Sequence, residues 1–249
     1  FVYNNKDRYE GDWKGNSKNG KGKMFFANGD IYEGGWVNDK KEGYGKLKIL
    51  INGIEYVGNF RNDKFSGEGV YKNAIGDSYE GSWVEGKKEG KGVFMSSIGD
   101  KYEGSWSNDM KNGYGEFEFV DGDKYKGHWK NDKIDGKGEY MFVNGAKCEG
   151  NFFDGELNGD GIFYFLNGNT YKGTFKKGKR QGFGILTLVD GGKYSGEWFN
   201  DEIAGQGIYK FSNGNVYEGM FKNGKMNGQG SYTFINGNLY IGEFKDGKR

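Results

Sequence analysis

YEGSWSNDMKNGYG, residues 102–115, is the stretch that decides the fold. It carries too much glycine for a helix, and nearly the same stretch returns along the whole chain. The copies are spaced 23 residues apart, with one spacing of 24 between Tyr32 and Tyr56. Because a fixed period is the signature of a repeat architecture, the repeat comes before any local structure. Aligned on the first tyrosine, the copies begin at residues 9, 32, 56, 79, 102, 125, 148, 171, 194, 217 and 240.

Six positions of the repeat are almost invariant. Position 1 is the tyrosine, which is replaced by Cys148 in one copy. Position 3 is glycine and position 5 is Trp or Phe in every copy, so all six tryptophans of the chain fall at position 5. Glycine also fills positions 12, 14 and 21, with Gly53 shifted by one, and these positions hold 41 of the 49 glycines. The glycine excess therefore belongs to one structural unit and not to a flexible linker.

The alternation within each copy predicts a β-hairpin. Tyr102, Gly104 and Trp106 are two residues apart and share one face of a strand. Asn108 and Asp109 at positions 7 and 8 favour a chain reversal. A second strand is expected from position 14, with apolar residues at positions 16 and 18 and an NG or DG turn before the next tyrosine. A helix would instead need apolar residues three and four apart and would not carry four fixed glycines per repeat.

The repeat predicts an all-β chain without an internal domain boundary. We expect about ten 23-residue hairpins in one elongated solenoid or meander, a twisted rod with an aromatic groove. The fixed strand glycines are expected to let a neighbouring ring lie across the backbone. The array is expected to span residues 1–249 as a single unit, and the partial repeats at both ends predict a longer array.

Composition narrows the function classes. Apolar residues make up only 34% of the chain and aromatic residues 18%, so the rings must form most of the core. A net charge of +1 argues against a nucleic-acid partner, which would need a basic surface. One cysteine excludes an intrachain disulfide framework. No apolar run has membrane-spanning length and no secretory signal is evident, which favours a cytoplasmic location.

Two further copies, YEGSWVEGKKEGKG from Tyr79 and YEGMFKNGKMNGQG from Tyr217, carry a family resemblance. The pattern resembles the MORN (membrane occupation and recognition nexus) repeat over the whole chain. The resemblance implies stacked β-hairpins, attachment near membranes through acidic phospholipids, and scaffolding by self-association. Abundant Asn and Lys without any proline resemble proteins from AT-rich protozoan genomes. An array made only of MORN repeats resembles the cytoskeletal MORN-repeat proteins of apicomplexan parasites. That likeness implies a cytoplasmic, cytoskeletal site peripheral to an inner membrane structure.

The expected function is a structural scaffold without catalytic activity. It would self-associate as a homodimer and organise other cytoskeletal proteins at a membrane-adjacent structure during cell division. One alternative is a module that binds phosphoinositides or other acidic phospholipids, and a second is the accessory repeat region of an enzyme encoded outside this sequence. One histidine and one cysteine offer little for an active site, since catalysis needs a convergent nucleophile, base and stabiliser.

The single cysteine and single histidine raise a metal hypothesis. Cys148 and His128 lie in adjacent repeats, and strand parity places them on opposite faces of one chain. A two-fold dimer would bring two of each together, and two cysteines with two histidines form a structural zinc set. The alternative is that Cys148 fills a tyrosine slot and His128 is a surface residue.

Two sets of residues near the turn are candidate contact sites. Apolar residues replace Lys or Arg in four repeats and predict a dimer interface in the C-terminal half: Ile134, Leu157, Ile203 and Met226. Basic residues after the turn are candidates for acidic phospholipid: Lys40, Lys41, Lys87, Lys88, Lys179 and Arg180.

Lipid contact through these basic residues is expected to be weak and salt-sensitive. They are interleaved with acidic residues, and physiological salt screens charges over about 8 Å. A solvated edge is the alternative. The rings at positions 1 and 5 could receive a segment of a partner protein, with a purely structural core as the alternative.

Overall fold

The computed structural model describes residues Phe1–Arg249 and contains 21 β-strands and no helix. The predicted all-β hairpin array is therefore confirmed. The chain divides into two compact units. The N-terminal unit comprises residues 1–121 and 129–132, and the C-terminal unit comprises residues 122–128 and 133–249.

The strands of the N-terminal unit alternate between about seven and about nine residues. They are β1 (Arg8–Lys14), β2 (Ser17–Phe25), β3 (Ile31–Val37), β4 (Lys40–Ile49), β5 (Ile54–Arg61), β6 (Lys64–Lys72), β7 (Ser78–Val84), β8 (Lys87–Met95), β9 (Lys101–Ser107) and β10 (Met110–Glu118). Strand β11 (Lys124–Lys130) contributes residues to both units.

The C-terminal unit repeats the same alternation. Its strands are β12 (Lys133–Met141), β13 (Lys147–Phe153), β14 (Glu156–Tyr164), β15 (Thr170–Lys176), β16 (Lys179–Thr187), β17 (Lys193–Phe199), β18 (Glu202–Lys210), β19 (Val216–Lys222), β20 (Lys225–Thr233) and β21 (Leu239–Phe244).

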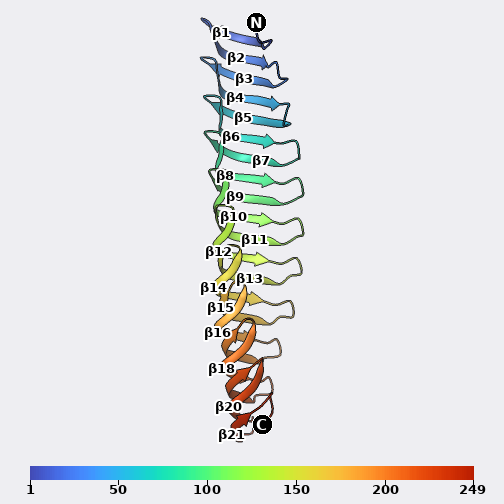
Figure 1. The fold of residues 1–249 in the computed structure, drawn as a ribbon, viewed down its shortest axis with the longest axis vertical. Coiled ribbons are helices and arrows are strands. Elements are labelled where there is room, and N and C mark those ends of the chain that lie inside the picture. The colour runs from blue at the N-terminus through green and yellow to red at the C-terminus, as the bar shows by residue number, and fades with distance from the viewer. The chain divides into compact units, whose positions relative to one another are not determined.

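Each unit is an antiparallel meander. From β1 to β10, and again from β12 to β21, each strand pairs with the strand before and after it in the chain. Figure 1 shows these strands following one another in chain order. Glycines at positions 3 and 14 face each other across each of these strand pairs, as Gly81 does with Gly92. A continuous row of paired glycines therefore crosses each unit.

The turn between the two strands of a hairpin has two residues. Asn108 and Asp109 both have positive φ angles, of 50° and 69°. This is the conformation of a type I′ hairpin turn, which Asn, Asp and Gly tolerate best. Because the turn reverses the chain in two residues, the second strand begins at position 9, at Met110 in this repeat. The prediction of a start at position 14 was wrong, and the residues assigned to a loop lie in the strand.

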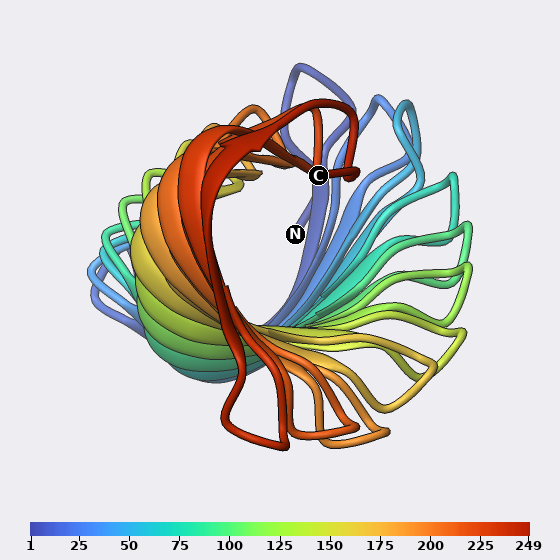
Figure 2. The ribbon, with the colours of Figure 1, turned by 90° about the horizontal axis from the view of Figure 1, so that it is seen from below.

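The second strand bends at position 12 instead of ending there. Gly113 has a φ of 93°, a left-handed conformation that favours glycine. The pairing register with β9 shifts between Lys111 and Gly115, which is the mark of a β-bulge. Seen along the stack in Figure 2, the hairpins of each unit are strongly curved.

The position-1 tyrosine explains two of the fixed glycines. A Cβ atom added at Gly92 would lie 2.3–2.5 Å from atoms of the Tyr79 ring, and one added at Gly81 would lie 2.8 Å from its hydroxyl oxygen. The Tyr79 hydroxyl donates a hydrogen bond to the carbonyl oxygen of Ser82 at 3.1 Å. The expectation that a ring lies across the strand glycines is therefore confirmed.

The rings at positions 1 and 5 form the core of each unit. Tyr79 meets Trp83 of its own repeat at 5.1 Å between ring centroids and Trp106 of the next repeat at 5.3 Å, both edge to face. The indole nitrogen of Trp83 donates to the carbonyl oxygen of Gly69 in the preceding repeat at 3.3 Å. The core is thus a ladder that alternates within and between repeats, with both ring and hydrogen-bond contacts.

Candidate functional site

A row of half-buried rings in the C-terminal unit is the most distinctive accessible surface. It occupies positions 16 and 18, at the end of each second strand and the start of the next loop. Position 16 pairs directly with the buried position-1 residue, as Leu186 does with Tyr171, so these side chains share the core face. We name this surface the aromatic lane: Tyr140, Phe142, Phe163, Phe165, Leu186, Leu188, Tyr209, Phe211, Tyr232 and Phe234.

The rings of the aromatic lane touch one another along the stack. Phe142 lies 6.0 Å from Phe163, which lies 4.7 Å from Phe165. A second run links Tyr209, Phe211, Tyr232 and Phe234 at centroid distances of 4.5, 5.7 and 4.8 Å. At its C-terminal end the lane opens into a hollow of about 410 Å³ lined by Met226, Tyr232, Phe234, Phe244, Gly247, Lys248 and Arg249.

In the N-terminal unit position 16 is apolar throughout, but position 18 is polar in two of the five repeats. Position 18 is Asn73 in one repeat and Ser96 in the next. Asn73 is engaged by the loop, since its side chain donates to Asp77 and accepts from the Asp77 backbone. The aromatic lane is therefore an uninterrupted row of apolar side chains only in the C-terminal unit.

The rings predicted to receive a partner, at positions 1 and 5, do not line this surface. Tyr171 and Phe175, for example, are buried. Sequence reasoning marked positions 16 and 18 as apolar but did not select them as a contact surface. One signal was present: positions 1 and 5 hardly vary between repeats, as a core requires, whereas position 18 ranges from Phe to Asn.

Position 10 lies beside the ring ladder and holds a cation in most repeats of the N-terminal unit. The Lys88 ammonium lies 4.5 Å from the Trp106 ring centroid and 5.4 Å from that of Tyr79. Burial lowers the pKa of Lys88, while Asp109 opposes the shift. Lys111 has the same arrangement over Trp129 at 4.8 Å. These lysines are structural cations packed on aromatic faces.

Within each basic pair that was predicted to contact lipid, the two residues face in different directions. Lys40, Lys87 and Lys179 are exposed at position 9. Their neighbours at position 10 turn inward: Lys41 lies 5.7 Å from the Tyr32 ring centroid, and the Arg180 guanidinium lies 4.3 Å from that of Trp198. Only one member of each pair faces solvent, and lipid contact there stays a prediction.

The four predicted dimer residues also occupy position 10. Ile134 and Leu157 are 8% and 5% exposed, and Ile203 and Met226 are half-buried. They lie in strands β12, β14, β18 and β20 and not in a loop. These four residues pack against the ring ladder of the C-terminal unit, at the position that lysine occupies in most repeats of the N-terminal unit. Their role in a dimer stays a prediction.

Cys148 and His128 lie on opposite faces of the C-terminal unit, as strand parity indicated. Cys148 is 5% exposed, and burial raises the pKa of its thiol to about 11. His128 is exposed, with Nδ1 3.0 Å from the carbonyl oxygen of Lys137. No group of three or more His, Cys, Asp or Glu side chains is arranged to hold a metal ion. A zinc site shared by two copies would need this thiol at the surface, and it stays an untested prediction.

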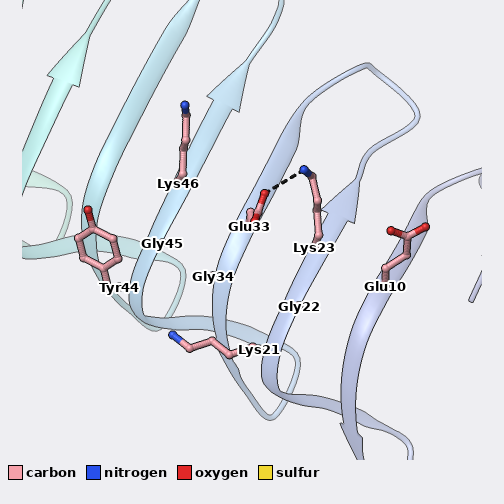
Figure 3. Close-up of a pocket in the computed structure, with 9 residues that line it drawn as sticks. All are labelled: Glu10, Lys21, Gly22, Lys23, Glu33, Gly34, Tyr44, Gly45 and Lys46. Carbon is pink, nitrogen blue, oxygen red and sulfur yellow. Dashed lines mark ion pairs between the residues drawn. The ribbon is translucent and has the colours of Figure 1, made fainter.

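The face opposite the rings carries a charged, glycine-floored surface in the N-terminal unit. Figure 3 shows Lys23 and Glu33 side by side across neighbouring strands, and their Nζ and Oε2 atoms lie 2.9 Å apart. The Lys23 hydrogen bond holds the pKa of Glu33 below its usual value. This surface has a hollow of about 580 Å³, which is lined by Glu10, Lys21, Gly22, Lys23, Glu33, Gly34, Tyr44, Gly45 and Lys46.

The loops between repeats form a second accessible apolar surface that sequence reasoning missed. At position 19, Val143, Leu166 and Val189 of consecutive loops are 69%, 70% and 76% exposed, and Ile235 is 75% exposed. Each side chain sits beside the positive-φ glycine of the preceding loop, as Val189 does beside Gly168. We name these four residues the loop ridge. A count of apolar residues at position 19 would have revealed it.

Ten hairpins and a final strand, with a tyrosine laid over paired glycines in all of the hairpins but one, can now be compared with known families. The sequence model of the MORN repeat matches residues 9–31, 32–48, 56–78, 79–101, 102–124, 125–147, 148–170, 171–193, 194–216, 217–239 and 240–249.

The chain belongs to the MORN repeat family.

The MORN repeat is a non-catalytic repeat, and arrays of it suggest a protein-binding or membrane-associated scaffold. The structure contains no helix of the length and hydropathy that a membrane crossing requires. No curated protein matches the MORN array.

Solved structures show only distant likeness to this MORN array. The TCP10 domain of Danio rerio CPAP in complex with a peptide of Danio rerio STIL is 14% identical, with a TM-score of 0.47, covering 96% of this chain and 99% of that one. The SAS-4 TCP domain of Drosophila melanogaster in complex with a proline-rich motif of Ana2 is 16% identical, with a TM-score of 0.41, covering 68% and 90%. These scores are low, and the functions of those proteins do not carry over to this chain.

Proposed function

We propose that this MORN array is a protein-binding scaffold whose aromatic lane receives the apolar side of a partner segment. The observation that carries the proposal is the run of half-buried rings at positions 16 and 18 of the C-terminal unit. Large rings left partly open to water are favourable contact residues, because they bury much area with few rotatable bonds.

The spacing of the lane favours a helical partner. Two strands per repeat set successive ring pairs roughly 9.6 Å apart, since neighbouring strands lie about 4.8 Å apart. Seven residues of an α-helix rise by about 10.5 Å. A helix lying along the lane would therefore present an apolar residue to each successive repeat once every seven residues. The bound segment is expected to be an amphipathic helix with a heptad stripe.

A designed peptide tests this proposal. The peptide is an amphipathic helix that carries leucine at every seventh position and at the adjoining positions of the same helix face. It is titrated into the full chain and its binding is measured by calorimetry. Phe211→Ser and Phe165→Ser should each weaken binding by on the order of tenfold or more, because each removes a contact ring. Phe183→Ser is the matched control, since Phe183 is 60% exposed on the opposite face and should leave binding unchanged. Equal loss in all three variants, or no binding to the wild type, would overturn the proposal.

Self-association, a cytoskeletal location and a role in cell division extend the scaffold proposal. Ile203 and Met226 are the candidate dimer residues that remain partly open to solvent. Light scattering over a concentration series, with and without a chelator, tests the dimer. A mass near twice 28.0 kDa would support it, and loss of that mass on chelation would support the zinc site. Colocalisation of the tagged chain with membrane-adjacent filaments in dividing cells tests the location.

Contact with anionic membranes is the second candidate function, and the loop ridge favours it. Its side chains project singly from consecutive loops, which suits entry into a fluid surface better than a packed protein interface. Lys193 and Lys210 face each other across β17 and β18 behind the ridge, where they could approach lipid phosphates. Flotation with phosphatidylserine vesicles should be lost in Val189→Asp and kept in Phe183→Ser. Equal flotation of the two variants would show that the loop ridge does not contact the membrane.

A further inference from the structure

Besides the strand pairing and the ring contacts, neighbouring hairpins meet where position 10 of one repeat lies against position 8 of the next. In every interface the backbone nitrogen of position 8 donates to the carbonyl oxygen of position 10, for example Asp109 to Lys88 at 3.1 Å and Gly224 to Ile203 at 3.0 Å. The side chains, however, come in two combinations only. Five interfaces pair Lys or Arg with Asp, and five pair an apolar residue with Gly.

The charged interfaces are Lys18–Asp39, Lys41–Asp63, Lys88–Asp109, Lys111–Asp132 and Arg180–Asp201, and the apolar ones are Phe65–Gly86, Ile134–Gly155, Leu157–Gly178, Ile203–Gly224 and Met226–Gly247. No interface mixes the two kinds. The cation and the carboxylate therefore vary together between repeats, although they lie about twenty residues apart in sequence.

Geometry explains the charged combination. The Asp109 carboxylate accepts a hydrogen bond from the Lys88 backbone nitrogen at 2.9 Å, and the same bond recurs at all five charged interfaces. The side-chain cation forms an ion pair with the carboxylate at three of the five interfaces, with N–O distances of 3.4 Å for Lys18–Asp39, 3.6 Å for Lys41–Asp63 and 3.1 Å for Arg180–Asp201. At Lys88, burial lowers the pKa of the ammonium group and the charge of Asp109 opposes that shift. The Arg180 side chain is only 20% exposed. A cation so far withdrawn from water requires a nearby opposite charge.

Geometry also explains the apolar combination. An aspartate next to Ile203 would hold a carboxylate beside an apolar side chain with no cation within reach. Glycine avoids this cost and suits the turn, since Gly224 has a φ of 73° and no atom would lie within 4 Å of an added Cβ. The turn conformation itself does not force the choice, because Asp109 adopts a φ of 69° at the equivalent place.

We propose that positions 10 and 8 form a pairing code that decides which hairpin can stack on which. A hairpin edge with Lys or Arg admits a hairpin whose turn carries Asp, and an apolar edge admits one whose turn carries Gly. The surface is the hairpin edge, and its partner is another hairpin of the same repeat, in this chain or in a second copy. The code does not depend on what the scaffold binds.

The order of charged and apolar interfaces along the chain indicates which mispairings the code disfavours. From the N-terminus the interfaces run charged, charged, apolar, charged, charged, apolar, apolar, charged, apolar, apolar. A slip by one repeat would mismatch five of nine pairs and a slip by two repeats six of eight, whereas a slip by three repeats would mismatch one of seven, so the code acts against the short slips. Nearly identical hairpins are prone to such slips and to exchange between copies, and a mismatch penalty disfavours them.

Swapping one interface in the full chain tests the code. Ile203→Lys and Gly224→Asp each create a mismatch, whereas the double variant recreates the charged combination. Each single variant should raise the rate of hydrogen exchange in strands β18 and β19 by on the order of tenfold, and the double variant should recover most of the loss. Simple addition of the two effects in the double variant would overturn the proposal.

The reciprocal swap in the N-terminal unit separates pairing from general damage. Lys88→Met and Asp109→Gly should each loosen β8 and β9, and the double variant should restore them. The coupling between Lys88 and Asp109 should shrink in high salt, while the coupling between Met and Gly in the double variant should not. Salt-independent coupling at both interfaces would refute a charge-based code. Because the two swaps lie in different units, misfolding of one variant leaves the other as a test.

Discussion

The N-terminal and C-terminal units consist of the same hairpin but differ in the side chains that pack beside its aromatic core. Both lay a position-1 tyrosine over two glycines and stack it on a position-5 ring. Beside that ladder, the N-terminal unit places mainly lysine and the C-terminal unit mainly Ile, Leu or Met. Position 18 likewise is polar in two repeats of the N-terminal unit and apolar in every repeat of the C-terminal unit, where it completes the aromatic lane. The comparison teaches that invariant positions make the array, while a few variable positions give each part of it a distinct surface.

Alkaline unfolding should show what the units share, and it has the largest expected effect. Burial raises the pKa of Tyr56 and Tyr102 in the N-terminal unit, and of Tyr171 in the C-terminal unit, to about 12. The unfolded chain releases these protons near pH 10, so the stability they contribute is complete below pH 10 and is lost as pH rises toward 12. Both units should unfold in this window, as measured by circular dichroism against pH. A folded circular dichroism spectrum retained well above pH 12 would contradict the prediction.

Glycine substitution at position 14 should damage the two units equally. Gly92→Ala and Gly184→Ala each place a methyl group within 2.6 Å of tyrosine ring atoms, so we expect a cost of about 3 kcal/mol in each case. Gly161→Ala is the control, because its repeat carries Cys148 instead of tyrosine, and there we expect about 1 kcal/mol. Chemical denaturation measures all three. A control as damaging as the other two would show that the ring is not the cause.

Position 10 should separate the units. Leu157→Ala removes a buried side chain from the C-terminal core and should cost about 2–4 kcal/mol. Lys88→Ala in the N-terminal unit should cost about 1 kcal/mol, because the loss of its ring contact is partly offset by relief of a desolvated charge. Denaturation midpoints of the two variants give the comparison. Equal losses would mean that both residues act only through their carbon atoms.

The glycine-floored face should contribute least. Lys23→Ala breaks an ion pair with Glu33 that is open to water on both sides, and the unfolding midpoint should stay within error. Phe183→Ser on the corresponding face of the C-terminal unit should be equally silent. A clear shift in either variant would indicate that this face supports the fold.

Much of the hairpin could be predicted from the sequence, and the misses have local causes. Alternation at Tyr102, Gly104 and Trp106 gave the first strand and its buried face. The second strand was placed five residues late, because a left-handed glycine normally ends regular structure. Here Gly113 supplies a bulge that the strand continues through. Similarly, Ile134 and Leu157 were assigned to an exposed edge because their neighbours at the same position are charged.

The sequence by itself determined the repeat, the turn positions and the aromatic core, because each follows from spacing within one hairpin. Only the tertiary structure decided that Lys88 lies on rings while Lys87 faces water, and that positions 16 and 18 form an open lane. It also brought together Lys88 and Asp109, whose link lies between hairpins. The reason is physical. The local pattern determines which face of the strand a residue lies on. Whether that residue is buried depends on how the neighbouring hairpin packs against it, and the order of residues alone does not determine that packing.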